Sequence, residues 1–179
     1  MKLTQILSIT IFALTVIACK NETKEAAPAD SGKLPETFNI TFNLTIPKDD
    51  TFQLYYTEDN SLNFGDDRSV KSVVKGGTAP QDVLFKLPVD VLPTNIRLDF
   101  GENKEQGDVV VNAMKLKYFD KTFEAKANLV KQYFFYNDFQ LKYDEATSTV
   151  KAVVGKDGVY DPLMFSAEAL KIELSKIVK

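Results

Sequence analysis

The sequence predicts an all-β fold, an antiparallel β-sandwich of jelly-roll-like form with one helical connection. Three observations carry this prediction. Residues 38–46 alternate apolar and polar side chains without a fault, which is the pattern of a strand with one buried face. Short apolar segments then recur between turn-forming residues, as in sandwiches and barrels. With 44% hydrophobic and 26% charged residues, the composition is that of a globular protein with a core.

Each further strand is predicted from a short apolar segment that ends at a turn signal. The strand at 38–46 ends at Pro47, and later segments end at Gly76–Gly77, at Pro88 or at Gly101. The segment 109–119 is either one long strand or a bent one. The remaining predicted strands are 52–57, 70–74, 83–87 and 95–100, followed by a hairpin of 139–143 with 149–154 across the turn at 144–147.

Two segments near the carboxyl end have ambiguous periodicity. In 121–136, apolar side chains recur at spacings near 3.6 residues among Ala, Glu and Lys, which predicts the helical connection. Residues 166–179 fit either an amphipathic helix or a strand. Because Leu170, Ile172 and Leu174 alternate with charged residues, we expect a closing strand there.

The amino terminus is typical of an exported protein. Residues 1–18 combine a basic start, a short apolar run and small residues at the end, which predicts a signal peptide. The run is too short to span a bilayer. Residues 19–33 are polar and lack large apolar side chains, so we expect a flexible tether before a folded domain at 34–179.

The end of the signal peptide resembles the bacterial lipobox, with Val16, Ile17 and Ala18 before Cys19, the only cysteine. This resemblance implies cleavage before Cys19 and lipid on its sulfur, which then anchors the chain to a membrane. The charged residues that follow resemble the export signals of Bacteroidota lipoproteins. They imply an outer-membrane location, with the periplasmic face and the cell surface both left open.

Charge and residue types exclude several functions. A net charge of -3 and a pI near 5.1 argue against a nucleic-acid partner, which requires a basic face. The chain has no His, the commonest general base and transition-metal ligand. It also lacks a nucleophile elbow, a phosphate-binding glycine loop and a cysteine metal motif. We therefore expect a protein that is not an enzyme and needs no cofactor.

Three residues are candidates for ligand binding. Arg97 and Asp99 are two positions apart in a predicted strand, so both point to one face. A structural salt bridge between them is the favoured interpretation, and bidentate binding of a sugar or carboxylate by Arg97 is the alternative. Tyr55 alternates with Phe52, Leu54 and Tyr56, which predicts that its ring faces outward and is available to stack on a sugar.

One predicted turn offers a candidate calcium site. Asp99, Glu102, Asn103 and Asp108 lie around the turn that follows the strand at 95–100. Calcium prefers hard oxygen ligands from loops, so these four side chains are candidate ligands for a structural ion. The favoured alternative is a polar turn that only connects two strands.

Segments of the middle of the chain resemble galactose-binding-like jelly rolls and carbohydrate-binding modules. These segments are 50–56 with Asn63–Phe64, then 92–101 and 107–111. The resemblance implies a sandwich and a binding role. The leading hypothesis is a membrane-anchored, non-enzymatic binding or accessory module for a glycan of the cell envelope. The alternatives are an assembly lipoprotein that binds another envelope protein and an enzyme that acts on glycans.

Overall fold

The computed structural model describes residues 36–179. The predicted signal peptide, the tether and the lipidated Cys19 lie outside these residues. The described residues form eleven strands, two short α-helices and two 3-10 turns. The strands are β1 (Thr37–Thr45), β2 (Asp50–Thr57), β3 (Ser69–Val74), β4 (Gln81–Val89), β5 (Asn95–Asp99), β6 (Val109–Tyr118), β7 (Lys121–Lys126), β8 (Phe134–Tyr136), β9 (Leu141–Asp144), β10 (Thr149–Ala152) and β11 (Leu163–Ser166). The α-helices are α1 (Ala127–Val130) and α2 (Glu168–Ile177), and the 3-10 turns cover 66–68 and 131–133.

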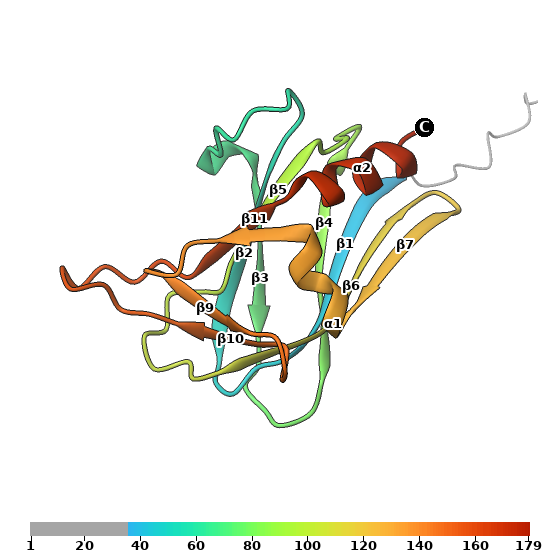
Figure 1. The fold of residues 1–179 in the computed structure, drawn as a ribbon. Helices are drawn as coiled ribbons and strands as arrows, with labels where there is room; N and C mark the ends of the chain where they lie inside the picture. Colours follow the sequence, from blue (N-terminus) through green and yellow to red (C-terminus); the bar gives the residue numbers. More distant parts are fainter. Residues whose placement is uncertain (1–35) are drawn as a thin grey trace, which may run out of the picture. The chain divides into compact units, whose positions relative to one another are not determined.

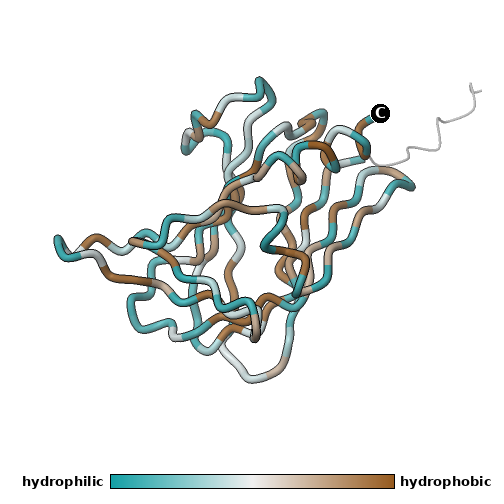
Figure 2. The backbone as a smooth tube through the Cα atoms, viewed as in Figure 1, coloured by the Kyte–Doolittle hydropathy of each residue, from teal (hydrophilic) through white to brown (hydrophobic). Residues whose placement is uncertain are grey.

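The strands form two antiparallel sheets that pack as a sandwich (Figure 1), as the sequence predicts. One sheet has the order β4-β1-β6-β10-β9. Strand β7 also pairs with β6, along a part of β6 that β10 does not cover. The other sheet has the order β3-β2-β5-β11-β8. We call them the six-stranded and the five-stranded sheet. Figure 2 shows hydrophobic and hydrophilic residues alternating along the strands, since each strand turns one side inward and the other to solvent.

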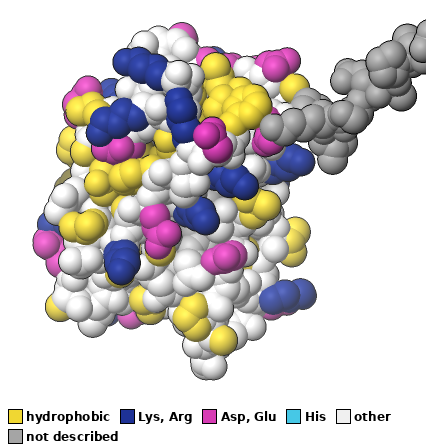
Figure 3. All heavy atoms as spheres, turned by 90° about the vertical axis from the view of Figure 1, so that its right-hand side faces the viewer, with side chains coloured by type: hydrophobic (Ala, Val, Ile, Leu, Met, Phe, Trp, Pro, Cys, Tyr) yellow, Lys and Arg dark blue, Asp and Glu magenta, His cyan; other side chains and the backbone are white. Residues whose placement is uncertain are grey.

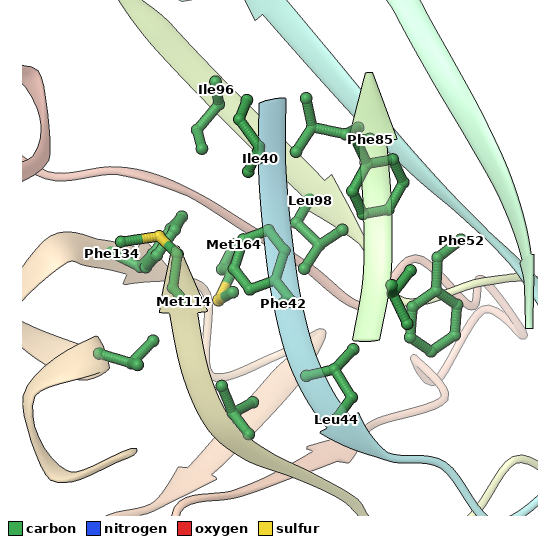
Figure 4. Close-up of a cluster of buried hydrophobic side chains, with 14 of the residues drawn as sticks. Ile40, Phe42, Leu44, Phe52, Phe85, Ile96, Leu98, Met114, Phe134 and Met164 are labelled. Carbon is green, nitrogen blue, oxygen red and sulfur yellow. The ribbon is translucent and has the colours of Figure 1, made fainter. Parts of the chain in front are cut away.

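The core lies between the two sheets. On β1, the apolar residues at 38, 40, 42 and 44 are all fully buried, which confirms the predicted alternation. Figure 4 shows Ile40 and Phe42 of β1 meeting Leu98 of β5 and Met164 of β11 across the sandwich. Because the described residues form both sheets and a shared hydrophobic core by themselves, we expect the domain 34–179 to fold on its own.

The prediction of a long helix over 121–136 is wrong. Residues 121–126 form β7, which pairs with β6 across a two-residue turn at Phe119 and Asp120. The helical connection shrinks to α1 and the 3-10 turn that follows it. The apolar spacing that suggests one helix belongs to separate elements: Ala125 is buried from a strand, and Val130 from α1. Pairing with β6 outweighs the weak helix propensity of this segment.

The prediction of a closing strand at 166–179 is also wrong. Residues 168–177 form α2, which buries Leu170, Leu174 and Ile177 and leaves Ile172 exposed. The spacing of four and three residues places the buried side chains on one helix face. Helix α2 contacts β5 and β11 of one sheet and β6 and β7 of the other, so it covers one opening of the sandwich (Figure 1). Among the described residues, no helix is long and apolar enough to cross a membrane.

Candidate functional site

The outer face of the five-stranded sheet carries a row of large side chains across four strands. Tyr55 of β2 is paired with Arg97 of β5, Arg97 with Phe165 of β11, and Phe165 with Phe135 of β8. Paired residues lie on the same face of a sheet. The row therefore has a polar half at Tyr55 and Arg97 and an aromatic half at Phe165 and Phe135.

Arg97 and Asp99 form a two-pronged ion pair in the polar half. Arg97 donates from Nε to Oδ1 of Asp99 at 2.7 Å and from Nη2 to Oδ2 at 2.6 Å. The two side chains are only 23% and 16% exposed. Burial raises the pKa of Asp99 and is partly offset by Arg97. The structure confirms that both residues share one face, and it shows the salt bridge that the sequence favours.

Tyr55 lies beside Arg97, and its surroundings correct one expectation. It points to the outer face, as predicted, and it is absent from the core that includes Tyr56. However, the Arg97 guanidinium lies 4.7 Å from its ring centroid, and Tyr55 is only 8% exposed. The prediction of a free stacking platform is therefore wrong, because Arg97 covers the ring. The Tyr55 hydroxyl donates to Oδ1 of Asp66 at 3.1 Å.

These contacts change the acidity of Tyr55. Burial raises its pKa to about 12, and the hydrogen bond to Asp66 and the charge of Asp99 act in the same direction. Tyr55 therefore stays neutral at physiological pH. It is a hydrogen-bonded support on which Arg97 rests through a cation–π contact.

A hollow of about 360 Å³ opens over the polar half of the row. We call it the polar notch. Asp161, from the loop before β11, reaches the notch and lies 3.7 Å from Nη2 of Arg97. Gln140 of the loop between β8 and β9 donates to Asp161 at 3.2 Å. The charged and amide residues that line the notch are Gln53, Lys71, Arg97, Asp99, Glu102 and Asp161.

The aromatic half of the row forms what we call the aromatic shelf, made of Phe135 and Phe165. Their ring centroids are 6.0 Å apart, with the planes tilted by 45°. Phe135 is 57% exposed and lies on the edge strand β8. Leu163 is paired with Asp99 on the same face. An exposed apolar surface therefore lies next to the notch, one strand away from Arg97.

The four candidate calcium ligands are not brought together. Asp99 is bound by Arg97, and Asp108 pairs with Lys151 at 3.2 Å. The side chain of Asn103 donates to the backbone oxygen of Asp49 and accepts from the backbone of Glu105. Within residues 36–179, no three His, Cys, Asp or Glu side chains are grouped as a metal site.

Asp50, at the start of β2, holds this turn through hydrogen bonds of its carboxylate. Its carboxylate accepts hydrogen bonds from the backbone N–H groups of Glu102 and Asn103 and from the Gln106 amide, at 3.0–3.3 Å. A Cβ at Gly101, where φ is +88°, would lie 2.3 Å from this carboxylate. The turn forms one wall of the notch through Gly101 and Glu102.

A second hollow, of about 750 Å³, lies between two loops at 137–140 and 153–157. Phe139 at its rim is 82% exposed, and Val154 is 49% exposed. The Phe139 turn is well ordered by hydrogen bonds, since Asn137 accepts from the backbone N–H groups of residues 139, 140 and 141. This surface is apolar and lies outside the polar notch.

The outer face of the six-stranded sheet is different again. Its hollow of about 330 Å³ is lined by Asn43, Asp82, Lys115 and Glu124 among small side chains, without any aromatic residue. Figure 3 shows the side of the molecule that lies on the right of Figure 1, where basic and acidic side chains are interspersed. That side presents no field of a single sign.

Sequence reasoning named four residues that line the notch, Tyr55, Arg97, Asp99 and Glu102, and missed the other members of the site. Asp161, Phe165 and Phe135 were missed because no strand was expected at 163–166 and a helix was expected over 121–136. The available signal was the alternation of Leu163 and Phe165 with the buried Met164 and Ser166. A four-residue segment with this pattern is too short to identify a strand by periodicity alone.

Comparisons with protein families, with curated proteins and with solved structures found no match to this chain. The resemblance to galactose-binding-like domains is therefore supported only as far as a two-sheet antiparallel β-sandwich. No relative assigns a ligand to the polar notch, so its function has to be argued from the chemistry of its residues.

Proposed function

We propose that this protein is a non-enzymatic binding module for glycans of the cell envelope, with the polar notch and the aromatic shelf as its binding surface. One observation carries the proposal. The outer face of the five-stranded sheet holds an arginine that is paired with Asp99, and a phenylalanine pair with one exposed member, Phe135, lies beside it.

The notch offers the hydrogen-bonding groups that a sugar requires. Arg97 uses one N–H on Nε and one on Nη2 for Asp99, so its other donors remain for a ligand. Lys71 adds donors, while Asp161 and Glu102 supply acceptors at the rim. Because hydroxyl groups both donate and accept, a polyol satisfies such a mixed set better than a purely anionic ligand does.

The shelf offers the apolar contact that a sugar also requires. The ring face of a pyranose carries C–H groups that pack on aromatic side chains. Phe135 is exposed enough for that role, whereas Tyr55 is covered by Arg97. Ligand sites typically combine an apolar surface with a few oriented polar groups, and this face of the sheet combines both.

The anchor belongs to the same proposal. A lipidated Cys19 would hold the domain at the outer membrane, where envelope glycans are available. The lack of any His in the chain and the absence of a nucleophile motif favour recognition over reaction.

A glycan array probed with the domain 34–179 tests the proposal. We expect binding to at least one class of envelope or dietary glycan, and loss of that binding in Lys71→Ala and Phe135→Ala. Matched controls on the six-stranded sheet are Lys115→Ala and Leu84→Ala, which remove an exposed lysine and an apolar side chain that is 49% exposed. Lack of binding to every glycan would overturn the proposal.

A second candidate function is docking of another envelope protein. It is favoured by the apolar loop surface, where Phe139 is 82% exposed and Val159 is 53% exposed. Exposed apolar clusters of this kind mark protein interaction sites. Cross-linking of the lipidated chain in cells, compared with a Phe139→Ser variant, tests it; an identical set of cross-linked partners would count against docking at these loops.

A further inference from the structure

Resting on the proposed glycan-binding function, we infer that the ligand is an uncharged oligosaccharide that lies across the strands, with one sugar in the polar notch and up to two following sugars on the aromatic shelf, whose two residues lie on neighbouring strands. The notch and the shelf are thus two subsites of one linear site. This assigns a class of ligand, its direction on the sheet and a limit to its recognised length.

The register of the sheet sets the direction. Tyr55, Arg97, Phe165 and Phe135 lie on four successive strands, and each is directly paired with the next. Neighbouring strands are about 4.8 Å apart, so Arg97 and Phe135 are separated by about 10 Å across the sheet. A single sugar ring covers about one strand spacing, and a ligand that reaches both positions therefore has more than one sugar.

The ends of the row limit the length. Strand β8, which carries Phe135, is the last strand of the sheet. At the other end, the row closes at Tyr55, whose ring is already covered by Arg97. A chain longer than about three sugars, at one sugar per strand spacing, would extend past the sheet edge and gain no further contact with this row.

The charges favour an uncharged ligand. Three carboxylates line the notch, at Asp99, Glu102 and Asp161, against the two cations Lys71 and Arg97. Arg97 is already engaged by Asp99 and is close to Asp161, so a sugar carboxylate would have to compete with both. An acidic sugar is repelled by the surplus negative charge, whereas hydroxyl groups are not.

Calorimetric titration of the domain 34–179 with size series of gluco-, manno- and xylo-oligosaccharides, from monosaccharide to hexasaccharide, tests the inference. For the series that binds, we expect the affinity to rise about tenfold or more from monosaccharide to trisaccharide, which corresponds to about 1.4 kcal/mol, and then to level off. A matched acidic series of oligogalacturonides should bind more weakly than the neutral ones.

Substitutions on the shelf separate the two subsites. Phe135→Ala should remove most of the gain in affinity from monosaccharide to trisaccharide, while Phe135→Tyr should keep that gain. Leu84→Ala on the six-stranded sheet is the control for loss of an exposed apolar side chain, and thermal unfolding of each variant checks that it is folded.

Failure of the two-subsite inference can be told apart from failure of the proposed glycan-binding function. Affinity that does not depend on length, equal losses for short and long ligands in Phe135→Ala, or preference for the acidic series would overturn the two-subsite inference and leave glycan binding in place. Absence of binding to all series and to the array would overturn the proposed function together with this inference.

Discussion

Both outer faces of the sandwich are formed by strands that alternate inward and outward side chains, but the two faces carry different kinds of side chain. The outer face of the six-stranded sheet presents Thr41 and Asn43 of β1 beside Lys115 and Glu124 of its neighbours. Such side chains are solvated individually and need no partner. The outer face of the five-stranded sheet instead holds a mostly buried ion pair, Arg97 and Asp99, and the covered ring of Tyr55.

The two faces differ in how far their charged groups are removed from water. Removing a guanidinium and a carboxylate from water costs free energy that their mutual attraction seldom exceeds by much. A sheet that only had to face solvent would carry residues like those of the other sheet. The cost of this arrangement supports the proposal of a binding surface around Arg97, and the following experiments test the contrast between the two faces, from the largest expected effect to the smallest.

Arg97→Ala should lower the free energy of unfolding by about 2–4 kcal/mol, because Asp99 would be left mostly buried without its partner. Denaturant unfolding measures the loss. Lys115→Ala, on the other outer face, should change the stability by less than about 0.5 kcal/mol. Arg97→Met combined with Asp99→Leu should recover most of the loss, since an apolar pair leaves no unpaired charge; equal losses in Arg97→Ala and Lys115→Ala would remove the contrast.

Asp50→Ala should cost about 2 kcal/mol, because its carboxylate accepts several hydrogen bonds that hold the wall of the notch. The comparison on the six-stranded sheet is Asp82→Ala, which breaks an exposed hydrogen bond of 2.6 Å to Asn43. There we expect a change below about 0.5 kcal/mol. Urea unfolding of both variants measures the two changes in the free energy of unfolding. A loss in Asp82→Ala as large as in Asp50→Ala would contradict the expectation.

Tyr55 should ionise near pH 12, well above the usual value for a tyrosine, because burial, Asp66 and Asp99 all raise its pKa. Since the pKa is raised in the folded state, this group stabilises the fold fully below about pH 10, and the contribution is lost as the pH rises from there through about 12. Absorbance of tyrosinate during alkaline titration, with Tyr55→Phe as the reference, measures it. Asp66→Asn should lower this pKa; an unchanged titration curve would show that Asp66 has no such role.

Added calcium should leave the unfolding midpoint unchanged, since three of the four candidate ligands, Asp99, Asn103 and Asp108, have separate partners. An ion that binds only the native state raises the free energy of unfolding by RT ln(1 + L/Kd), where L is the ion concentration and Kd its dissociation constant. Thermal unfolding with calcium and with a chelator makes the comparison. A rise in midpoint with calcium would restore the turn as a metal site.

Local sequence patterns were enough to predict an element and the direction of its side chains where one face of the element is buried and the other is solvated. The alternation over 38–46 predicts β1 and its inward side chains, and the spacing of 97 and 99 predicts their common face. The same reasoning predicts that Tyr55 points outward. It failed over 121–136 and 166–179, because short apolar segments fit both the helical period and the strand period. Whether such a segment forms a helix or a strand depends on what it packs against.

The sequence by itself predicted the sandwich, the alternation of its strands and the common face of Arg97 and Asp99, because these predictions rest on residues that are close in the chain. Only the tertiary structure decided the site. It brings Asp161, Phe165 and Phe135 beside residues 55–99 through pairing across strands that are distant in sequence, and it covers Tyr55 with Arg97. Strand order and register depend on how the whole core is packed, and no local pattern contains them.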